Sequence, residues 1–387
     1  MTDEGYIALS KPTIGQEEID EVVDTLRAGW VTEGPKVRRF EEAFRDYVGA
    51  AHAIAASSGT AALHVALAAA GIGPGDEVIT TPFTFCATVN VILYIGATPV
   101  LADIRLDDYN IDPGEVEKRI TARTKAMIPV HFAGQPCDMD RLLALAREHG
   151  LVIIEDAAHA AGAEYRGRRI GSIGDMTAFS FYASKNMTTG DGGMLVTNDE
   201  ELARRARLFV HQGLTRDSWA RYSHNGFWQY DVAALGFKYN LSDVLASLGI
   251  HQLARLPHLT EARQRIARQY QQLFEPVPEI IVPQALGEVS HVWHLFVIRL
   301  RTEMLSIDRG RFIELMRERG IATSVHYIPI HYHSAYCQRF GDLRGQFPNT
   351  ESAYEGIVSL PIYPSLTEAQ VQRVGETAID IIRRHRR

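Results

Sequence analysis

The 387-residue chain is too long for one small core, and its length suits a large domain followed by a smaller one. A hydrophobic share of 46% with 22% charged residues is typical of a globular protein. The formal net charge of −7 argues against a surface for polyanions, so we expect no nucleic-acid partner. The most apolar stretch, residues 89–101, is too short to span a bilayer, which predicts no membrane association.

The three cysteines, Cys86, Cys137 and Cys337, lie far apart and show no C-x-x-C spacing. A disulfide framework or a thiolate metal site is therefore not expected, and a reducing compartment fits this pattern. The acidic start of the chain lacks the basic and apolar regions of a secretory signal. Together these features predict a cytoplasmic protein.

The first hundred and fifty residues alternate between helical and strand-like patterns. Residues 17–28 and 37–48 are amphipathic at helical spacing, and a Gly- and Pro-containing loop separates them. Strands are then expected at 52–56, 77–81, 99–103, 126–131 and 151–155, and helices at 60–70, 87–95, 113–120 and 139–148. This alternation predicts the α/β class, with a mostly parallel sheet flanked by helices.

Two closely spaced strands at 177–182 and 194–197 precede a helix at 200–209. Two long helices, 242–256 and 259–274, are expected to link two domains. Beyond them the pattern predicts a strand at 294–300, a helix at 308–319, a strand at 322–326 and a terminal helix at 367–384. We therefore predict a large domain over residues 1–249 and a smaller α+β domain over 250–387.

Lys185 stands out, because only six of the 40 basic residues are lysines. It follows an apolar, strand-like run and precedes a turn that contains Gly190, Gly192 and Gly193. A lysine amine can lose its proton and form a Schiff base, whereas an arginine cannot. The alternative from this window is a structural lysine with a buried stem and a solvated head.

Three further segments contain residues that could bind a ligand or take part in catalysis. Residues 57–63 form a strand–helix junction of small residues, where free N–H groups could bind a phosphate, or which could be an ordinary helix N-cap. An apolar strand ends in the acidic pair Glu155 and Asp156, at the sheet edge where α/β proteins bind ligands, and a carboxylate there could pair with a protonated ring nitrogen or cap the next turn. Residues 236–243 open a long helix, and Asn240 lies just before its cap.

A phosphate turn, a carboxylate at a strand end and a lysine in a glycine-bounded loop are the parts that hold pyridoxal 5′-phosphate (PLP). Their order along the chain matches fold-type I PLP enzymes. The chain resembles the DegT-type family of PLP-dependent sugar aminotransferases over nearly its whole length. The runs that carry this resemblance are residues 29–35, 57–63, 75–79, 155–159, 180–194 and 239–243.

Among members of that family, the chain looks most like the enzymes that aminate C4 of UDP-4-keto sugars, such as the 4-amino-4-deoxy-arabinose aminotransferase. Residues 236–240 and 292–298 carry this closer likeness. Related sugar dehydratases have histidine in place of the lysine, so Lys185 favours transamination. The family usually has Glu before the Gly-Gly pair, where this chain has Asp191.

The resemblance implies a role for each matching residue. Lys185 would form the internal aldimine and shuttle the proton between the substrate carbon and the cofactor. Asp156 would pair with the pyridinium nitrogen, and His159 would lie beside the ring and help to position Asp156 or the cofactor. Phe85 would stack on the face of the ring.

Gly59, Thr60 and Ser180 would bind the cofactor phosphate. In the family, the Asn of the last motif reaches the phosphate of the neighbouring subunit's cofactor. Asn240 therefore implies a homodimer with two shared active sites.

Five residues are candidates for contact with the sugar nucleotide: Trp30, Thr32, His211, Tyr239 and His326. His326 also belongs to a histidine-rich segment with His331 and His333, but no acidic or cysteine partner accompanies them in the sequence. We therefore expect no metal site there.

The resulting prediction is a ping-pong aminotransferase that takes an amino group from L-glutamate and gives it to a keto sugar linked to a nucleotide. C4 of a UDP-4-keto sugar is the first choice. C3 of a dTDP-3-keto sugar and a keto-inositol stay open as acceptors. Two other readings are a PLP-dependent lyase or desulfurase that acts on amino acids, and a PLP-binding regulatory protein without turnover.

Overall fold

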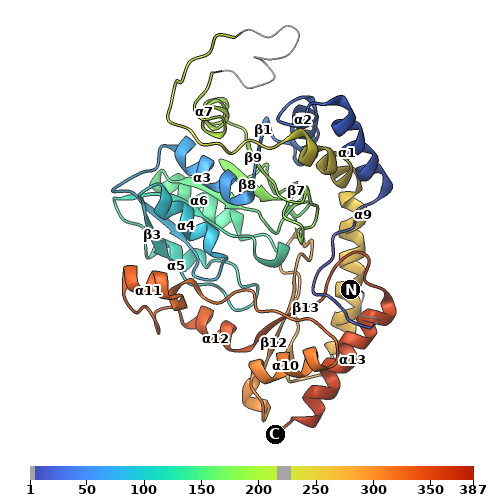
Figure 1. The fold of residues 1–387 in the computed structure, drawn as a ribbon. Coiled ribbons are helices and arrows are strands. Elements are labelled where there is room, and N and C mark those ends of the chain that lie inside the picture. Colours follow the sequence, from blue (N-terminus) through green and yellow to red (C-terminus); the bar gives the residue numbers. More distant parts are fainter. Residues whose placement is uncertain (1–4, 216–227) are drawn as a thin grey trace.

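The computed structural model describes residues 5–215 and 228–387, and its centre is a seven-stranded sheet (Figure 1). The strand order is β1-β9-β8-β5-β4-β2-β3, and β9 alone runs antiparallel to its neighbours. The strands are β1 (His52–Ala56), β2 (Glu77–Thr80), β3 (Thr98–Leu101), β4 (Thr124–Ile128), β5 (Val152–Asp156), β8 (Met176–Ser180) and β9 (Gly193–Thr197). The predicted α/β class with a mostly parallel sheet is confirmed.

Helices cover both faces of this sheet, and the alternation of side chains along each strand explains why. In β1, Ile54 packs into the cluster that includes α3, whereas Ala53 and Ala55 pack into the cluster on the opposite face. The covering helices are α2 (Pro35–Val48), α3 (Gly59–Ala70), α4 (Cys86–Tyr94), α5 (Pro113–Glu117), α6 (Met139–His149) and α7 (Glu200–Val210). Helix α3 is almost wholly apolar because it is buried nearly all round.

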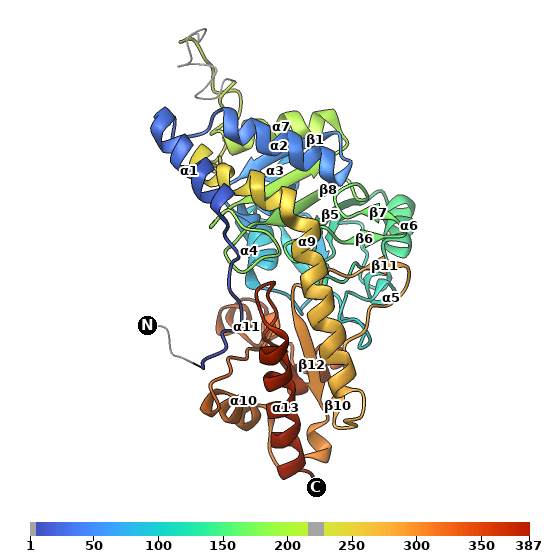
Figure 2. The same ribbon diagram turned by 90° about the vertical axis from the view of Figure 1, so that its right-hand side faces the viewer.

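The two linking helices predicted at 242–256 and 259–274 are a single helix, α9 (Asp243–Phe274), with Pro257 inside it. Proline removes one backbone hydrogen bond, which is why the sequence indicated a break. Leu256 and Leu259 are buried on either side of Pro257, so packing on both flanks keeps the chain helical. Figure 2 shows α9 running from the large sheet to the small one.

The second part of the chain has its own antiparallel sheet, ordered β10-β12-β13, with α10 and α13 beside it. Its elements are β10 (Ile280–Ile281), β12 (Phe296–Leu300), α10 (Arg309–Glu318), α11 (Ser334–Phe340), α12 (Pro348–Gly356), β13 (Ile357–Leu360) and α13 (Glu368–Arg384). Ile7, far away in the sequence, joins the core of this part and pairs with Ile321. The proposed boundary between residues 249 and 250 falls inside α9 and stays a prediction.

The strand predicted at 322–326 is wrong. Only Ser324 pairs with a strand residue, through two backbone hydrogen bonds to Ser359 of β13. After Ser324 the segment makes no further strand pairing, and the N–H of Ile330 donates to the carbonyl of Pro82 at 2.9 Å. A third small sheet, also absent from the prediction, contains β11 (Val289–Ser290), β6 (Glu164–Tyr165) and β7 (Arg168–Arg169).

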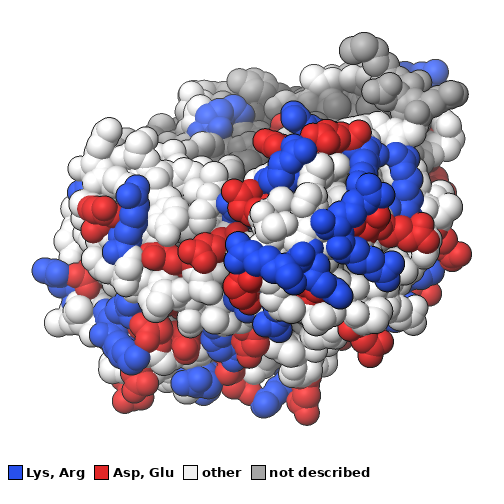
Figure 3. All heavy atoms as spheres, turned by 90° about the horizontal axis from the view of Figure 1, so that it is seen from below, with Lys and Arg blue, Asp and Glu red and all other residues white. Residues whose placement is uncertain are grey.

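No helix among the described residues is both long and apolar enough to cross a membrane. On the face drawn in Figure 3, acidic and basic side chains lie side by side rather than in one large field of a single sign.

Helix α2 depends on a residue that is distant in the sequence. Its N-cap, Gly34, has no side chain to accept hydrogen bonds from the first turn. The buried Asp243 carboxylate at the start of α9 takes that role, accepting from the backbone N–H groups of Gly34 at 2.8 Å, Val37 at 3.0 Å and Lys36 at 3.1 Å. These contacts hold the loop that joins α1 (Gln16–Ala28) to α2 against α9.

Replacement of Asp243 by Ala should lower the free energy of unfolding by about 2–3 kcal/mol, because three backbone donors lose a charged acceptor in a buried place. Urea unfolding followed by circular dichroism measures this change. Asp20→Ala, on an exposed part of α1, is the matched control and should change stability by less than about 0.5 kcal/mol. Equal midpoints for the two variants would contradict the proposed capping.

Candidate active site

A cavity of about 470 Å³ opens beside the carboxyl ends of β5 and β8 and reaches residues of the second sheet. Eight residues that the sequence singled out line it: Gly59, Thr60, Phe85, Asp156, His159, Ser180, Lys185 and His326. Their elements lie far apart along the chain, and the parallel sheet brings them to one edge.

Lys185 lies in the turn after β8, where its backbone N–H donates to the carbonyl of Tyr182 at 2.9 Å. Its side chain is half-buried and lines the cavity. Burial lowers the pKa of the Lys185 amine to about 8, and the nearby Asp156 carboxylate opposes that shift. About a tenth of this amine is therefore neutral at pH 7, far more than for an ordinary lysine, and the neutral form is a competent nucleophile and base.

Asp156 ends β5, and two hydrogen bonds fix its carboxylate. Oδ2 accepts from the Thr88 hydroxyl at 2.8 Å, and Oδ1 accepts from the Ala158 N–H at 3.1 Å. Burial raises the pKa of this carboxyl, while the two hydrogen bonds and Lys185 act against the rise. A cation beside Asp156 would stabilise its charged form, as a protonated ring nitrogen does.

Glu155, the other half of the acidic pair, points away from the cavity because neighbouring side chains of a strand alternate between faces. It is fully buried and accepts hydrogen bonds from the Gly174 N–H and the Thr177 hydroxyl, both at 2.8 Å. His131 Nε2 lies 2.8 Å from its other oxygen. Glu155 therefore stabilises the fold, and Asp156 alone serves the cavity.

His159 is buried, and both of its ring nitrogens already have partners. Nδ1 accepts the backbone N–H of Ala133 at 3.3 Å, and Nε2 lies 2.9 Å from the hydroxyl of Tyr327. Burial, with a smaller effect of Lys185, holds the pKa of His159 well below its ordinary value, so the ring is neutral. Because Nδ1 is an acceptor, the single ring proton is on Nε2 and is donated to Tyr327.

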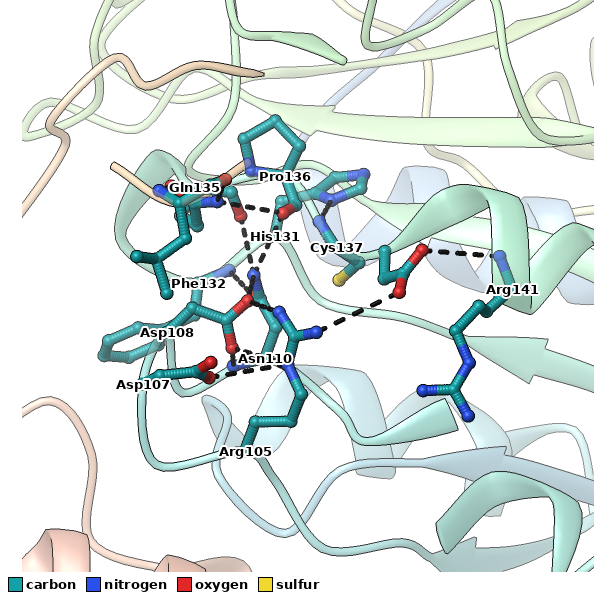
Figure 4. A network of polar contacts seen from close by, with 12 residues as sticks. Arg105, Asp107, Asp108, Asn110, His131, Phe132, Gln135, Pro136, Cys137 and Arg141 are labelled. Carbon is teal, nitrogen blue, oxygen red and sulfur yellow. Dashed lines mark hydrogen bonds and ion pairs between the residues drawn. The ribbon is translucent and has the colours of Figure 1, made fainter. Parts of the chain in front are cut away.

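A polar network fixes the loop that carries Ala133 (Figure 4). Asn110 Oδ1 accepts the N–H of Phe132 at 2.9 Å, and its Nδ2 donates to carbonyls of the same loop at 3.1 Å. Asp108 in turn holds Asn110 and pairs with Arg105. The network therefore sets the direction of the Ala133 N–H and, through it, the proton position on His159.

The junction of β1 and α3 forms an anion-binding corner. Ser58 caps α3 by accepting the Ala61 N–H at 3.0 Å, and Gly59 and Thr60 begin the helix, where the dipole is positive. A Cβ atom at Gly59 would lie 2.8 Å from the Cβ of Ser180, so only glycine lets the helix start approach β8 so closely. The residues at this corner fit a phosphate group.

The other predicted site residues, Trp30, Thr32, His211, Tyr239 and Asn240, do not line this cavity of the single chain. Trp30 and His211 both contact Glu33, and the carbonyl of Thr32 accepts the N–H of Asp243. They gather instead around the start of α9 and the loop before α2. Tyr239 lies 3.3 Å from His64, and Asn240 contacts Lys238.

The histidine-rich segment divides among separate partners. His326 contacts Ser359 at 2.8 Å, and His331 contacts Glu351 at 3.1 Å, an acidic partner that the sequence did not reveal. In the part of the chain that the structure describes, no group of three or more His, Cys, Asp or Glu residues could hold a metal ion.

Sequence reasoning missed several residues of the cavity wall. Ser10 comes from the N-terminal segment, which crosses between the two sheets, and nothing local in its sequence marks it. Thr88 and His294 look like ordinary helix and strand residues. Tyr327 directly follows His326 and could have been found from that neighbour.

Comparison with known proteins identifies the class to which this fold and site belong. Residues 12–378 match the DegT/DnrJ/EryC1/StrS aminotransferase family. The spore coat polysaccharide biosynthesis protein SpsC of Bacillus subtilis is 49% identical over 379 residues, which cover 98% of this chain and 97% of SpsC. The chain therefore belongs to the DegT/DnrJ/EryC1/StrS aminotransferase family, and the enzyme is an aminotransferase.

Solved structures agree with this assignment. The putative sugar aminotransferase Spr1654 of Streptococcus pneumoniae, in its PMP form, has a TM-score of 0.91 and 34% identity, covering 98% of this chain and 99% of that one. Helicobacter pylori PseC, an aminotransferase of pseudaminic acid biosynthesis, has a TM-score of 0.91 and 31% identity, covering 98% and 100%.

The low pKa of Lys185 predicts a pH profile for its reactivity. In the cofactor-free protein, acetylation of Lys185 by acetic anhydride should rise with pH around a midpoint of about 8, because only the neutral amine reacts. In the urea-unfolded chain the midpoint should return towards the ordinary value of 10.5. Peptide mass spectrometry after brief labelling measures both profiles, and coinciding midpoints would refute the effect of burial.

Proposed function

We propose that this enzyme transfers an amino group from L-glutamate to a nucleotide-linked keto sugar, at C4 of a UDP-4-keto sugar. PLP is its cofactor, and when bound it accepts the amino group and withdraws electrons from the reacting carbon. The observation that carries the proposal is the meeting of Lys185, Asp156 and the anion-binding corner at Gly59 in one cavity.

Each of these groups suits one part of the cofactor. Lys185, with its easily lost proton, would bind the aldehyde carbon and later move the proton at the substrate carbon. Asp156 would hold the ring nitrogen in its protonated form. Gly59, Thr60 and Ser180 would bind the phosphate, and the exposed ring of Phe85 on the cavity wall would stack on the cofactor.

The choice of a sugar acceptor is supported by the relatives. SpsC is named for polysaccharide biosynthesis, PseC for pseudaminic acid biosynthesis and Spr1654 as a sugar aminotransferase. By analogy with them, this enzyme would supply an amino sugar for a polysaccharide. The cysteine pattern supports a cytoplasmic location for it. Streptomyces DesV, 38% identical, has been solved with a ketimine intermediate. C3 of a dTDP-3-keto sugar and a keto-inositol remain the competing acceptors.

The enzyme would act as a homodimer with shared sites. Among the described residues on the cavity wall, Lys185 is the only lysine or arginine, whereas the proposed ligands carry phosphates and carboxylates. One chain thus has little positive charge for its ligands, and polar side chains from outside its own cavity would have to supply further hydrogen bonds. Asn240, Trp30, Thr32, His211 and Tyr239 lie outside their own cavity and would complete that of a second chain.

The first test is a half-reaction. Purified enzyme with PLP should convert L-glutamate to 2-oxoglutarate in one equivalent per site, and Lys185→Ala should lower the rate by at least about 10⁴-fold because its base and covalent anchor are lost. Release of ammonia from the amino acid would support the hypothesis of a PLP-dependent lyase. PLP binding without formation of any 2-oxoglutarate would support the hypothesis of a regulatory protein without turnover. Once the half-reaction is established, a panel of UDP- and dTDP-keto sugars read by mass spectrometry identifies the acceptor.

The second test concerns the shared sites. Lys185→Ala and Asn240→Ala would each impair every site of their own homodimers. When the two variants are unfolded together and refolded, half of the dimers are mixed and have one intact site, so about a quarter of wild-type activity should return. Refolding each variant alone is the control. A mixture no more active than its components would show that each chain builds its own site.

A further inference from the structure

Two adjacent residues on the cavity wall, His326 and Tyr327, each have a buried partner that determines where their protons point. Ser359 is fully buried, and its hydroxyl lies 2.8 Å from His326 Nδ1. Residues 5–215 and 228–387 offer no other acceptor within hydrogen-bonding distance of this hydroxyl. Because a buried hydroxyl proton needs an acceptor, Ser359 donates to Nδ1 of His326.

The ring proton of His326 is consequently on Nε2. Burial, with a smaller effect of Lys185, lowers the pKa of His326 to about 4, so the ring is neutral at pH 7 and carries one proton. No described residue accepts a hydrogen bond from Nε2. His326 therefore presents a neutral N–H donor to the cavity.

Tyr327 is also a neutral hydrogen-bond donor, for a different reason. The neutral His159 donates its Nε2 proton to the Tyr327 oxygen, so the tyrosine proton must point elsewhere. No acceptor for it lies among the residues that the structure describes. Burial raises the pKa of Tyr327, which keeps the hydroxyl protonated. The cavity thus has a second neutral donor, and the rings of His326 and Tyr327 have their centroids 5.1 Å apart.

We propose that the His326 Nε2–H and the Tyr327 hydroxyl together bind the carbonyl oxygen of the keto substrate. This inference rests on the proposed function and deepens it. Both residues line the same cavity as Lys185, and the charge of Lys185 acts on His326 and on His159 behind Tyr327. His159, with both nitrogens engaged, is a positioning residue that acts through Tyr327.

A neutral pair of donors suits an uncharged oxygen that becomes negative during the reaction. When the amino nitrogen carried by the cofactor bonds to the carbonyl carbon, the π pair of the C=O bond moves to oxygen. The two donors would stabilise the negative charge on that oxygen. The oxygen finally leaves as water with the two protons of the amine. Both donors are already oriented by Ser359 and His159, so little reorganisation is needed at that moment.

The kinetic test uses 2-oxoglutarate as the keto probe and the enzyme loaded with the amino form of the cofactor. Tyr327→Phe and His326→Leu should each slow the single-turnover rate by on the order of 10²-fold, because each removes one donor. His326→Gln, which keeps an N–H near the Nε2 position, should recover most of that loss. Tyr332→Phe, on the same segment but outside the cavity, is the matched control and should react at the wild-type rate.

A second readout does not depend on turnover. The aldehyde form of the holoenzyme binds 2-oxoglutarate without reacting, so ¹³C-edited infrared spectra of probe labelled at C2 report hydrogen bonding to its carbonyl. That band should lie at higher wavenumber in Tyr327→Phe than in the wild type, while cofactor affinity and visible absorbance stay the same. An unchanged band with a shifted cofactor absorbance would overturn the proposal, since Tyr327 would then bind the cofactor.

The proposed aminotransferase function and the proposed donor pair can be disproved separately. If the wild type forms no 2-oxoglutarate from glutamate, the proposed function fails and the donor pair with it. If the wild type reacts normally and Tyr327→Phe and His326→Leu react equally fast, only the donor pair is overturned.

Discussion

The site depends on a half-buried amine and a buried carboxylate that lie in the same cavity. Burial favours the neutral form of each, and their mutual attraction favours the charged forms. For Lys185 burial dominates, so its pKa falls to about 8. For Asp156, hydrogen bonds from Thr88 and Ala158 oppose burial and prepare the carboxylate for a cationic partner. The sheet imposes this balance, because it brings both groups to one buried edge.

Around that pair, the polar side chains divide into those with complete hydrogen bonding and those left open. Glu155 and His159 are satisfied by protein groups and orient their neighbours. The amine of Lys185 has no hydrogen-bond or ion-pair partner among the described residues, and the protons of His326 and Tyr327 find no acceptor there. These three residues are half-buried and line one cavity, so a ligand bound there can supply the partners that the protein does not.

Long-range contacts decide what surrounds the site. Asp243 at the start of α9 caps α2, and the same helix extends to the second sheet, so one element connects the loop of Trp30 and Thr32 with the core near Tyr270. The N-terminal segment adds Ser10 to the cavity wall and Ile7 to the core of the second part. The two parts of the molecule therefore meet at the cavity, and both supply its walls.

The sequence by itself determined the α/β class, the alternation of strands and helices along the chain, and the choice of Lys185 and Asp156 as residues of one cofactor site. These features depend on local periodicity and on short motifs. It could not show that α9 continues through Pro257 or that residues 322–326 leave the sheet, because packing of Leu256 and Leu259 and the single pairing of Ser324 outweigh local preference. Only the tertiary structure placed Ser359 behind His326 and Ala133 behind His159. The position of a ring proton depends on partners distant in sequence, and no local pattern records them.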